Sequence, residues 1–419
     1  MLNDIALLNL NPLPYVLPTR AYNNRPSLVV VLSILVSMPL LFLSTLASAD
    51  EKDTINMIVG LTRTLDDNLF RQSSSVRPAS DTVTSAYAGI RVDKQYSMQR
   101  LKFDYTLNSY NYQNNKKLNF NAGNYKATWL WSLTPRLIGS ISSEKTQTQY
   151  GFLDVGVRST PAISTNEVQN FVADWSPYGN WHMLGGFTRT LSTNSVFFQP
   201  DRGSTYNSLD FGLKYAFTSG SGITLMEHQR QGDFAIGTVS LGYPSKFSEN
   251  ESEAKIDWLL SGKSILNMRA AYVQRNHENA SNFPSRDYDG LVGSVNYTWT
   301  PTSKLGLTLA IASDINSYQT NYSNYNRMNT LSFSPLYAYS EKLTVRGNAS
   351  VMERSFLGGG VIPDSNRVDT TQSTSLAIDW MPRRYVTIGA NLQQSSRSSN
   401  VAGFDFSDLS TGVTANLNF

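Results

Sequence analysis

Apolar and polar residues alternate along most of this chain, in short runs that are typical of β-strands with one apolar face. In the run from Leu343 to Val351, the odd-numbered residues are Leu, Val, Gly, Ala and Val, and the even-numbered residues are Thr, Arg, Asn and Ser. A transmembrane barrel strand needs about 9–11 residues of this kind, with apolar side chains toward lipid and polar ones toward the lumen. The pattern therefore predicts an antiparallel sheet with one lipid-facing side.

Aromatic residues end these runs at intervals of 40 to 44 residues: Trp131, Trp175, Phe217, Trp258, Trp299, Tyr339 and Trp380. A turn sequence follows each of them within a few residues. A two-strand unit that repeats with an aromatic residue at one height indicates a transmembrane β-barrel, with these side chains forming a periplasmic girdle. A soluble β-propeller or solenoid of similar period is the alternative.

The N-terminal region resembles an export signal. Residues 28–46 form a long apolar stretch, Arg20 and Arg25 precede it, and Ala47-Ser48-Ala49 follows as a cleavage site. We therefore expect a signal peptide with an N-terminal extension over residues 1–49 and an outer-membrane barrel over residues 50–419. An uncleaved anchoring helix is the alternative.

Turns and termini predict the number of strands. Short turns fall near residues 93–95, 134–135, 177–179, 219–221, 261–263, 301–303, 340–342 and 382–384. Eight turns join sixteen strands, and terminal strands near 54–64 and 407–419 make eighteen; sixteen is the alternative. The fold class is thus an all-β, up-and-down, antiparallel transmembrane β-barrel. A shift of the apolar parity at Gly123-Asn124 is interpreted as a β-bulge.

The last strand has the most regular pattern. Alternation from Leu409 runs to the terminal residue, Phe419. A final amphipathic strand that ends in phenylalanine resembles the signal read by the outer-membrane barrel assembly machinery. Phe419 is therefore the candidate assembly signal.

The composition of the chain argues against several classes of function. The chain has no cysteine, so neither a disulfide framework nor a thiolate metal site is available, and its net charge of +3 argues against a nucleic-acid partner. Its three histidines, His182, His228 and His277, lie in no recognisable nucleophile motif. We therefore expect no enzyme activity, no catalytic residue, no metal and no cofactor.

Charged residues on the inward parity are the candidate lining of the lumen: Asp174, Asp210, Lys214, Lys255, Asp257, Arg269, Lys304, Arg346 and Asp379. Together they predict a mixed-charge wall that selects solutes. The alternative is that they solvate the lumen or pair across strands. Tyrosines and amides in 109–115 and 318–327 suit sugar binding, and an outer interfacial belt is the alternative.

The chain resembles the EpsL-type outer-membrane proteins of exopolysaccharide biosynthesis clusters, which are associated with exosortase systems. The resemblance rests on the segment Leu65–Arg71 (Leu-Asp-Asp-Asn-Leu-Phe-Arg), the Asp-Trp-x-Pro turns at 174–177 and 379–382, and the terminal Leu417-Asn-Phe419. It implies an outer-membrane channel for export of an exopolysaccharide, with outer-membrane lipid, the polysaccharide chain, the barrel assembly machinery and periplasmic export proteins as partners. A general diffusion porin and a non-conducting scaffold for the synthesis machinery are the alternatives.

Overall fold

The computed structural model describes residues 54–73, 75–149, 151–152, 160–196, 203–234, 246–278, 287–318, 323–358 and 366–419. They include one 3-10 helix, η2 (Lys116–Leu118), and these strands: β1 (Ile55–Asp66), β2 (Asp81–Tyr96), β3 (Gln99–Tyr112), β4 (Phe120–Thr134), β5 (Leu137–Gln149), β6 (Ile163–Tyr178), β7 (Trp181–Asn194), β8 (Ser204–Ala216), β9 (Gly222–Phe234), β10 (Lys246–Ser261), β11 (Ser264–His277), β12 (Tyr288–Trp299), β13 (Leu305–Ser317), β14 (Tyr325–Ser340), β15 (Leu343–Leu357), β16 (Val368–Arg383), β17 (Val386–Ser399) and β18 (Phe406–Asn418). No helix among the described residues is long and apolar enough to cross a membrane. The predicted signal peptide, residues 1–49, lies outside them.

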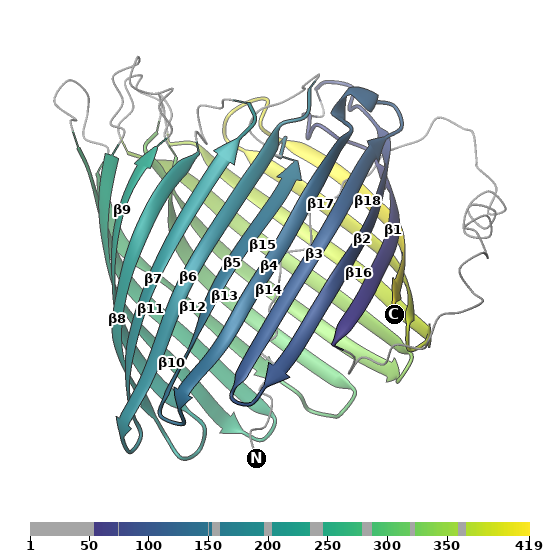
Figure 1. Cartoon of the computed structure of the whole chain (residues 1–419). Coiled ribbons are helices and arrows are strands. Elements are labelled where there is room, and N and C mark those ends of the chain that lie inside the picture. Colours follow the sequence, from purple (N-terminus) through teal and green to yellow (C-terminus); the bar gives the residue numbers. More distant parts are fainter. Residues whose placement is uncertain are drawn as a thin grey trace.

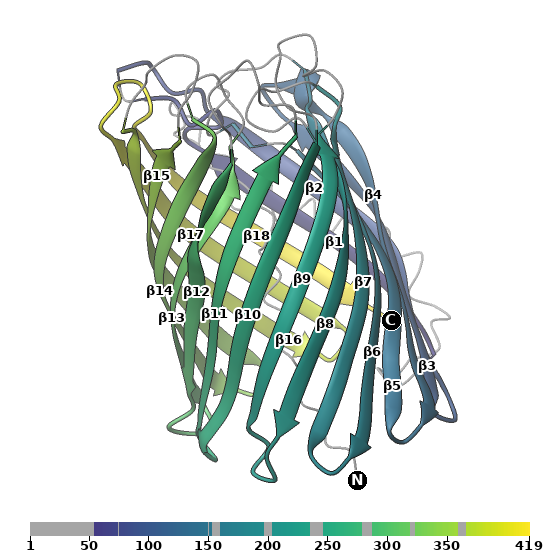
Figure 2. The ribbon, with the colours of Figure 1, turned by 90° about the vertical axis from the view of Figure 1, so that its left-hand side faces the viewer.

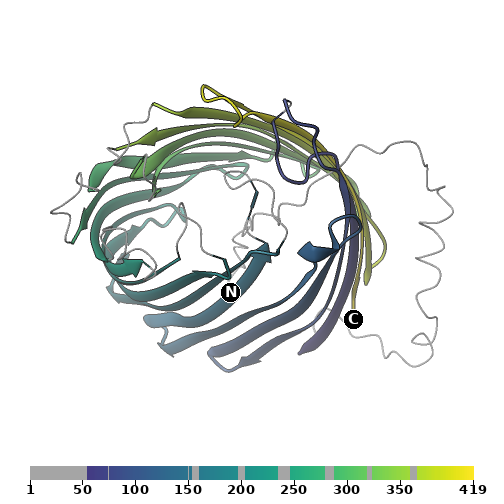
Figure 3. The same cartoon turned by 90° about the horizontal axis from the view of Figure 1, so that it is seen from above.

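The strands form one closed barrel (Figure 1). Each strand pairs antiparallel with its neighbours in the chain, and β1 also pairs with β18, from Ile58↔Asn418 to Leu65↔Thr411. Seen from above, the strands make an oval ring (Figure 3). The predicted fold class and the count of eighteen strands are confirmed.

The short turns all lie at one end of the barrel, and the strand ends that the longer connections join lie at the other (Figures 1 and 2). Barrels of this type have short periplasmic turns and longer extracellular loops. The turn predicted near residues 93–95 is displaced, because β2 continues to Tyr96 and the chain reverses at Ser97 and Met98. The left-handed backbone of Ser97, with φ of 54°, makes this two-residue reversal.

The two faces of the sheet differ in polarity as the alternation predicts. On β8, Leu209, Phe211 and Leu213 are about half exposed on the outer face. At the alternate positions, Ser208 and Asp210 point inward, where Ser208 donates a hydrogen bond to the Asp210 carboxylate. Apolar side chains thus contact lipid, and polar side chains face the lumen.

The β-bulge predicted at Gly123-Asn124 is wrong. β3 and β4 keep one register from Tyr110↔Phe120 to Arg100↔Leu130, and on the other side the β4–β5 ladder ends at Tyr125↔Lys145 without a bulge at this position. The apolar parity changes because Phe120 and Ala122 face inward, where Phe120 stacks on Tyr110 at 4.5 Å between ring centroids. An apolar cluster inside the barrel, not an extra residue in the strand, accounts for the pattern.

Backbone hydrogen bonds close the barrel at the C-terminal end of the chain. The Met57 amide donates to the Phe419 carbonyl oxygen, and the Phe419 amide donates to the Met57 carbonyl oxygen, each at 2.8 Å. The Phe419 ring lies 6.4 Å from the ring of Tyr385. The last residue therefore extends the pairing between the first and last strands.

Candidate functional site: the inner wall of the barrel

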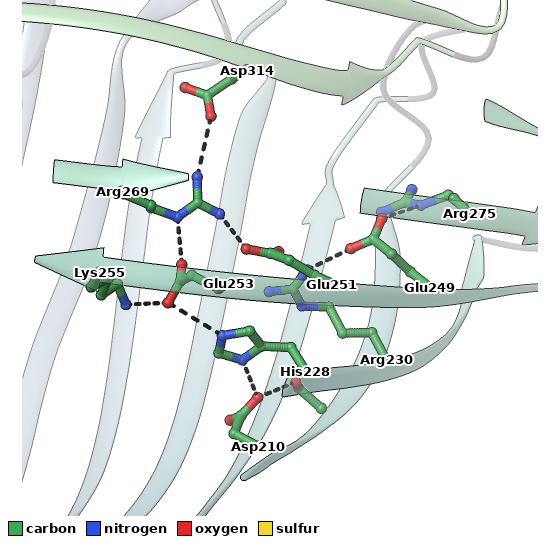
Figure 4. A network of polar contacts seen from close by, with 11 residues as sticks. Asp210, His228, Arg230, Glu249, Glu251, Glu253, Lys255, Arg269, Arg275 and Asp314 are labelled. Carbon is green, nitrogen blue, oxygen red and sulfur yellow. Dashed lines mark hydrogen bonds and ion pairs between the residues drawn. The ribbon is translucent and has the colours of Figure 1, made fainter. Parts of the chain in front are cut away.

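The main charged feature of the inner wall is a network on β8–β11, which we call the charged ladder (Figure 4). Its acidic members are Glu249, Glu251 and Glu253, which alternate along β10 and are all buried. Lys255 follows them on β10; β8, β9 and β11 supply Asp210, His228, Arg230, Arg269 and Arg275, and Asp314 reaches Arg269 from β13. Three of the predicted lining residues meet here: Asp210, Lys255 and Arg269. Lys214 lies outside the ladder, further along β8, in register with His182.

Each glutamate of the charged ladder contacts at least two nitrogen-bearing side chains. Arg230 Nη1 lies 2.5 Å from Glu249 Oε1 and 2.7 Å from Glu251 Oε2. Arg275 Nε lies 2.6 Å from Glu249 Oε2, and Arg269 pairs with both Glu251 and Glu253. Buried charges are tolerated where several hydrogen-bonded partners surround them. The ladder is thus a wall of paired charges.

Three of these side chains could also hold a metal ion, because ligand atoms of His228, Glu251 and Glu253 lie within 4.8 Å of one another. His228 Nδ1 lies 2.6 Å from Asp210 Oδ1, an arrangement that often orients a metal-binding histidine. However, Lys255 Nζ already lies 2.6 Å from Glu253 Oε1, and Arg230 and Arg269 contact Glu251. Since cations of the chain already neutralise these carboxylates, we assign the group to the ion-pair network.

The aspartates that precede girdle tryptophans each have a polar partner near the short-turn end. His182 Nδ1 lies 2.7 Å from Asp174 Oδ1, and the Asn267 amide donates to Asp257 Oδ1 at 2.7 Å. Asp379 pairs with the guanidinium of Arg346, another predicted lining residue. Lys304 differs from its predicted position on an inward strand: it lies in the turn before β13, and its ammonium donates to the Tyr339 carbonyl oxygen.

Sequence reasoning missed several members of the wall. Besides the three glutamates, these include the pairs Arg91–Asp104 at 2.7 Å and Lys126–Glu144 at 2.7 Å. One signal was present: charged residues recur at every second position from Glu249 to Lys255. Such spacing places charges on a single face of a strand.

The predicted girdle residues lie on the outer face near the short turns. Trp175, Trp299, Tyr339 and Trp380 are exposed, and Trp258 and Phe217 contact each other edge to face at 5.5 Å. Trp131 is buried, because its indole covers Gly139, where an added Cβ would lie 2.4 Å from the ring. The predicted role of the seven aromatic residues at the membrane interface stays a prediction.

An apolar shelf lines the extracellular part of the lumen beside β1–β4. It consists of Leu69, Phe70, Val83, Tyr112, Leu118 and Phe152. Val83 and Tyr112 come from the inner faces of β2 and β3, and the others come from three connections at the extracellular end. Loops therefore fold against the wall here.

The tyrosines proposed as sugar platforms are covered by protein among the described residues. Tyr110 stacks on Phe120, and Tyr112 is buried in the apolar shelf. Tyr318 contacts Phe356 edge to face at 4.9 Å, and the Arg354 guanidinium lies over its ring. Tyr322 lies outside the described residues. The faces that a sugar ring would need are thus already occupied on these three side chains.

The segment Asp66–Arg71 forms a second buried polar group, which we call the seam clasp. Arg71 Nη2 lies 3.1 Å from Asp408 Oδ2, and its Nη1 lies 3.8 Å from Asp66 Oδ1. Burial lowers the pKa of the Arg71 guanidinium, and the two aspartates oppose that shift. The left-handed backbone of Arg71, with φ of 54°, turns the side chain back toward them.

The seam clasp also replaces missing strand pairing. The ladder between β1 and β18 ends at Leu65↔Thr411. Above it, the Leu409 amide donates to Asp67 Oδ1, and the Asn68 side-chain amide donates to the Ser407 carbonyl oxygen. The motif that carries the family resemblance therefore closes the barrel seam in this structure.

Comparisons with known proteins agree with the fold. The family model described as "Putative beta-barrel porin 2" matches residues 253–419. The outer membrane protein OpdK of Pseudomonas aeruginosa is 11% identical, with a TM-score of 0.50, over 87% of this chain and 98% of that chain. OccK9 (OpdG) of the same organism is 11% identical, with a TM-score of 0.51, over the same shares. The comparison with curated proteins finds no match.

The closed barrel with its polar inner wall has the fold of porin-like outer-membrane barrels, and the porin family model matches its C-terminal part. At these identities, the likeness to solved structures concerns the fold alone, and the family model covers the C-terminal part of the chain. The solute is therefore a separate question.

Proposed function

We propose that this channel exports an exopolysaccharide from the periplasm. The observation that supports the proposal is the pairing of charges along the inner wall, in the charged ladder and in pairs such as Arg91–Asp104 and Arg346–Asp379. A wall of paired charges and hydroxyls offers a sugar polymer many weak hydrogen bonds and no strong electrostatic trap. Passage requires contacts that are weak enough to release the chain.

The resemblance of Leu65–Arg71 to EpsL-type proteins is the second support. This segment forms the seam clasp, whose role is structural. The resemblance therefore supports the assignment to an EpsL-type class more than it supports the identity of the solute. In this proposal the barrel assembly machinery reads Phe419 during insertion, and periplasmic export proteins deliver the polymer to the short-turn end. The nine proposed lining residues act together, and the girdle aromatics hold the barrel at the periplasmic interface.

A clean deletion in the producing strain tests the proposal. We expect the secreted polysaccharide to fall and polymer to accumulate in the periplasm, and a plasmid copy to restore secretion. An unchanged secreted yield contradicts export. Loss of polymer without accumulation favours the scaffold alternative, because the synthesis machinery then fails before transport.

Planar-bilayer recordings separate export from general diffusion. We expect the purified barrel to conduct ions. The strain's own polysaccharide, added on the periplasmic side, should then interrupt the current. Dextran of matched length is the control polymer. Equal block by both polymers favours a general diffusion porin, and a sealed bilayer favours the scaffold.

One pair of substitutions tests the role of the paired wall. Asp104→Asn removes the partner of Arg91 on the inner wall, and Glu167→Gln removes the partner of Lys145 on the outer face, where the two lie 3.3 Å apart. We expect only the first substitution to shift the reversal potential toward anion preference, because its released charge faces the lumen. Equal reversal potentials would contradict this assignment of the wall.

A further inference from the structure

The barrel wall is interrupted between β12 and β13. Their ladder runs only from Trp299↔Leu307 to Gly293↔Ser313. Beyond it, residues 288–292 of β12 pair with β11, and residues 314–316 of β13 pair with β14, but the two segments do not pair with each other. Figure 2 shows the wall that contains these strands.

Beyond the last register pair, the edges of β12 and β13 overlap face to face and form no strand pairing. Tyr288 and Val292 lie on the inner face of β12, since Val292 pairs with Ala271 and both are buried in the cluster with Tyr288. Ile315 follows Asp314, which points inward to Arg269, so alternation places Ile315 on the outer face of β13. Yet Ile315 packs on this cluster, and the Tyr325 ring lies 5.0 Å from Tyr288. The inner face of β12 therefore covers the outer face of β13 and β14.

Gly290 marks the closest approach in this overlap. A Cβ added there would lie 2.7 Å from Ile315 Cδ1 and 2.9 Å from Arg327 Nη2. The missing side chain lets both neighbours reach the β12 backbone. Arg327 Nη1 lies 3.5 Å from the Leu291 carbonyl oxygen, which has no β13 partner in the ladder.

The interruption lies at membrane depth. It begins six residues above the girdle residue Trp299, which corresponds to roughly 15 Å of the apolar band of about 25 Å when strands tilt by about 40°. At this level Leu291 is 68% exposed on the outer face. The overlap therefore opens toward the outer leaflet.

The side chains in the overlap combine an apolar lining with the guanidinium of Arg327, and Arg275 of the charged ladder lies over the Tyr288 ring at 5.4 Å. Tyr288, Val292, Ile315 and Tyr325 supply the lining. Among the described residues, no carboxylate forms an ion pair with Arg327, which instead donates a long hydrogen bond to the Leu291 carbonyl oxygen. Such a lining fits an acyl chain, and the guanidinium fits an anionic head group.

We propose that the overlap between β12 and β13 is a lateral binding slit for an anionic amphiphile with one long acyl chain, which enters from the outer leaflet. The acyl chain enters by displacing Ile315 from its packing against the cluster that contains Val292, and the head group binds Arg327 in place of the Leu291 carbonyl. The slit is separate from the axial path of the channel.

A reversible clamp tests the slit. The chain has no cysteine, so Val292→Cys/Ile315→Cys can be linked by a short bis-methanethiosulfonate reagent in nanodiscs. The probe is an undecanoic acid with a terminal dansyl group, and its fluorescence reports binding. We expect the clamp to weaken binding at least tenfold or about 1.4 kcal/mol, and reduction to restore it. Bilayer conductance should not change.

Two controls sharpen this experiment. Val295→Cys/Ile311→Cys links register partners below the interruption and should leave binding unchanged. Arg327→Gln should weaken binding of the acid about tenfold, as expected for a lost bond to a charged group, and leave binding of its methyl ester unchanged. Failure of the wild-type barrel to bind the acid, or equal binding with the clamp closed, overturns the proposal. Failure of the reagent to link Val292→Cys and Ile315→Cys contradicts the overlap itself.

Discussion

Among the described strands, three neighbouring pairs stop pairing before their extracellular ends: β1/β18, β4/β5 and β12/β13. The seam (β1/β18) and the slit (β12/β13) close these gaps differently. At the seam, β18 continues above Thr411 without β1, and the side chains of Asp67 and Asn68 take the place of strand backbone. At the slit, β12 continues from Gly293 without β13, and one arginine reaches its edge. The seam is closed by specific polar contacts, whereas the slit is covered by apolar side chains.

The difference shows two ways to finish a barrel wall. A hydrogen-bonded clasp is directional, so it fixes one arrangement of the two edges. Apolar contacts are not directional, so the edges of β12 and β13 can slide or separate at a smaller cost in free energy. We therefore expect the seam to be the more rigid of the two regions.

The largest expected effect comes from Arg71→Ala. It leaves Asp66 and Asp408 buried without their cation, which costs about 3–5 kcal/mol in folding free energy. Folded barrels migrate differently from unfolded ones on cold SDS gels, so the unfolding midpoint can be read by heating before electrophoresis. Arg91→Ala, which removes an exposed wall arginine, is the control and should shift the midpoint little. Equal midpoints for the two variants would contradict a structural clasp.

A smaller loss is expected for Asn68→Ala. The Asn68 amide bonds the carbonyl oxygens of Ser407 and Gln72, and its Oδ1 accepts from the Gln72 amide. Leaving these buried groups unpaired costs about 1–3 kcal/mol. Urea titration of the barrel in detergent micelles measures this change. Asn111→Ala, on an exposed side chain of β3, is the matched control; if it lowers stability as much, the seam contacts are not specific.

Amide hydrogen exchange compares the two edges directly. We expect amides of residues 289–292 to exchange about tenfold faster than those of residues 61–64, which corresponds to about 1.4 kcal/mol in local opening free energy. The reason is that the former segment has one paired neighbour and the latter has two. Equal protection would indicate that the overlap is as firmly closed as the ladder.

The smallest effect is expected for Arg327→Ala. Its hydrogen bond to the Leu291 carbonyl oxygen spans 3.5 Å, which is a weak contact. Global stability should fall by less than about 1 kcal/mol, measured by the same heating assay as for Arg71→Ala. A loss as large as that of Arg71→Ala would mean that the arginine closes the wall structurally, and the slit would then be a second seam.

Much of the inner wall could be placed from the sequence, but its contacts could not. Parity placed Asp210, Lys255 and Arg269 on the inner face. It did not reveal that they share one network, because strand register depends on neighbours distant in the sequence. Near Phe120 the apolar side chains switch to the other alternate positions, which predicts a bulge. Alternation alone cannot distinguish an inward apolar cluster from an inserted residue.

The sequence by itself determined the class of fold. A period of two residues within each strand and about 41 residues between girdle aromatics are local and repeated properties, and they specify an up-and-down barrel. They favoured eighteen strands over sixteen, and the structure has eighteen. Only the tertiary structure decided how the wall closes. The seam clasp joins residues more than 330 positions apart, and the slit arises where two neighbouring strands stop pairing. Both depend on the relative positions of strands in the closed barrel, which no local pattern encodes.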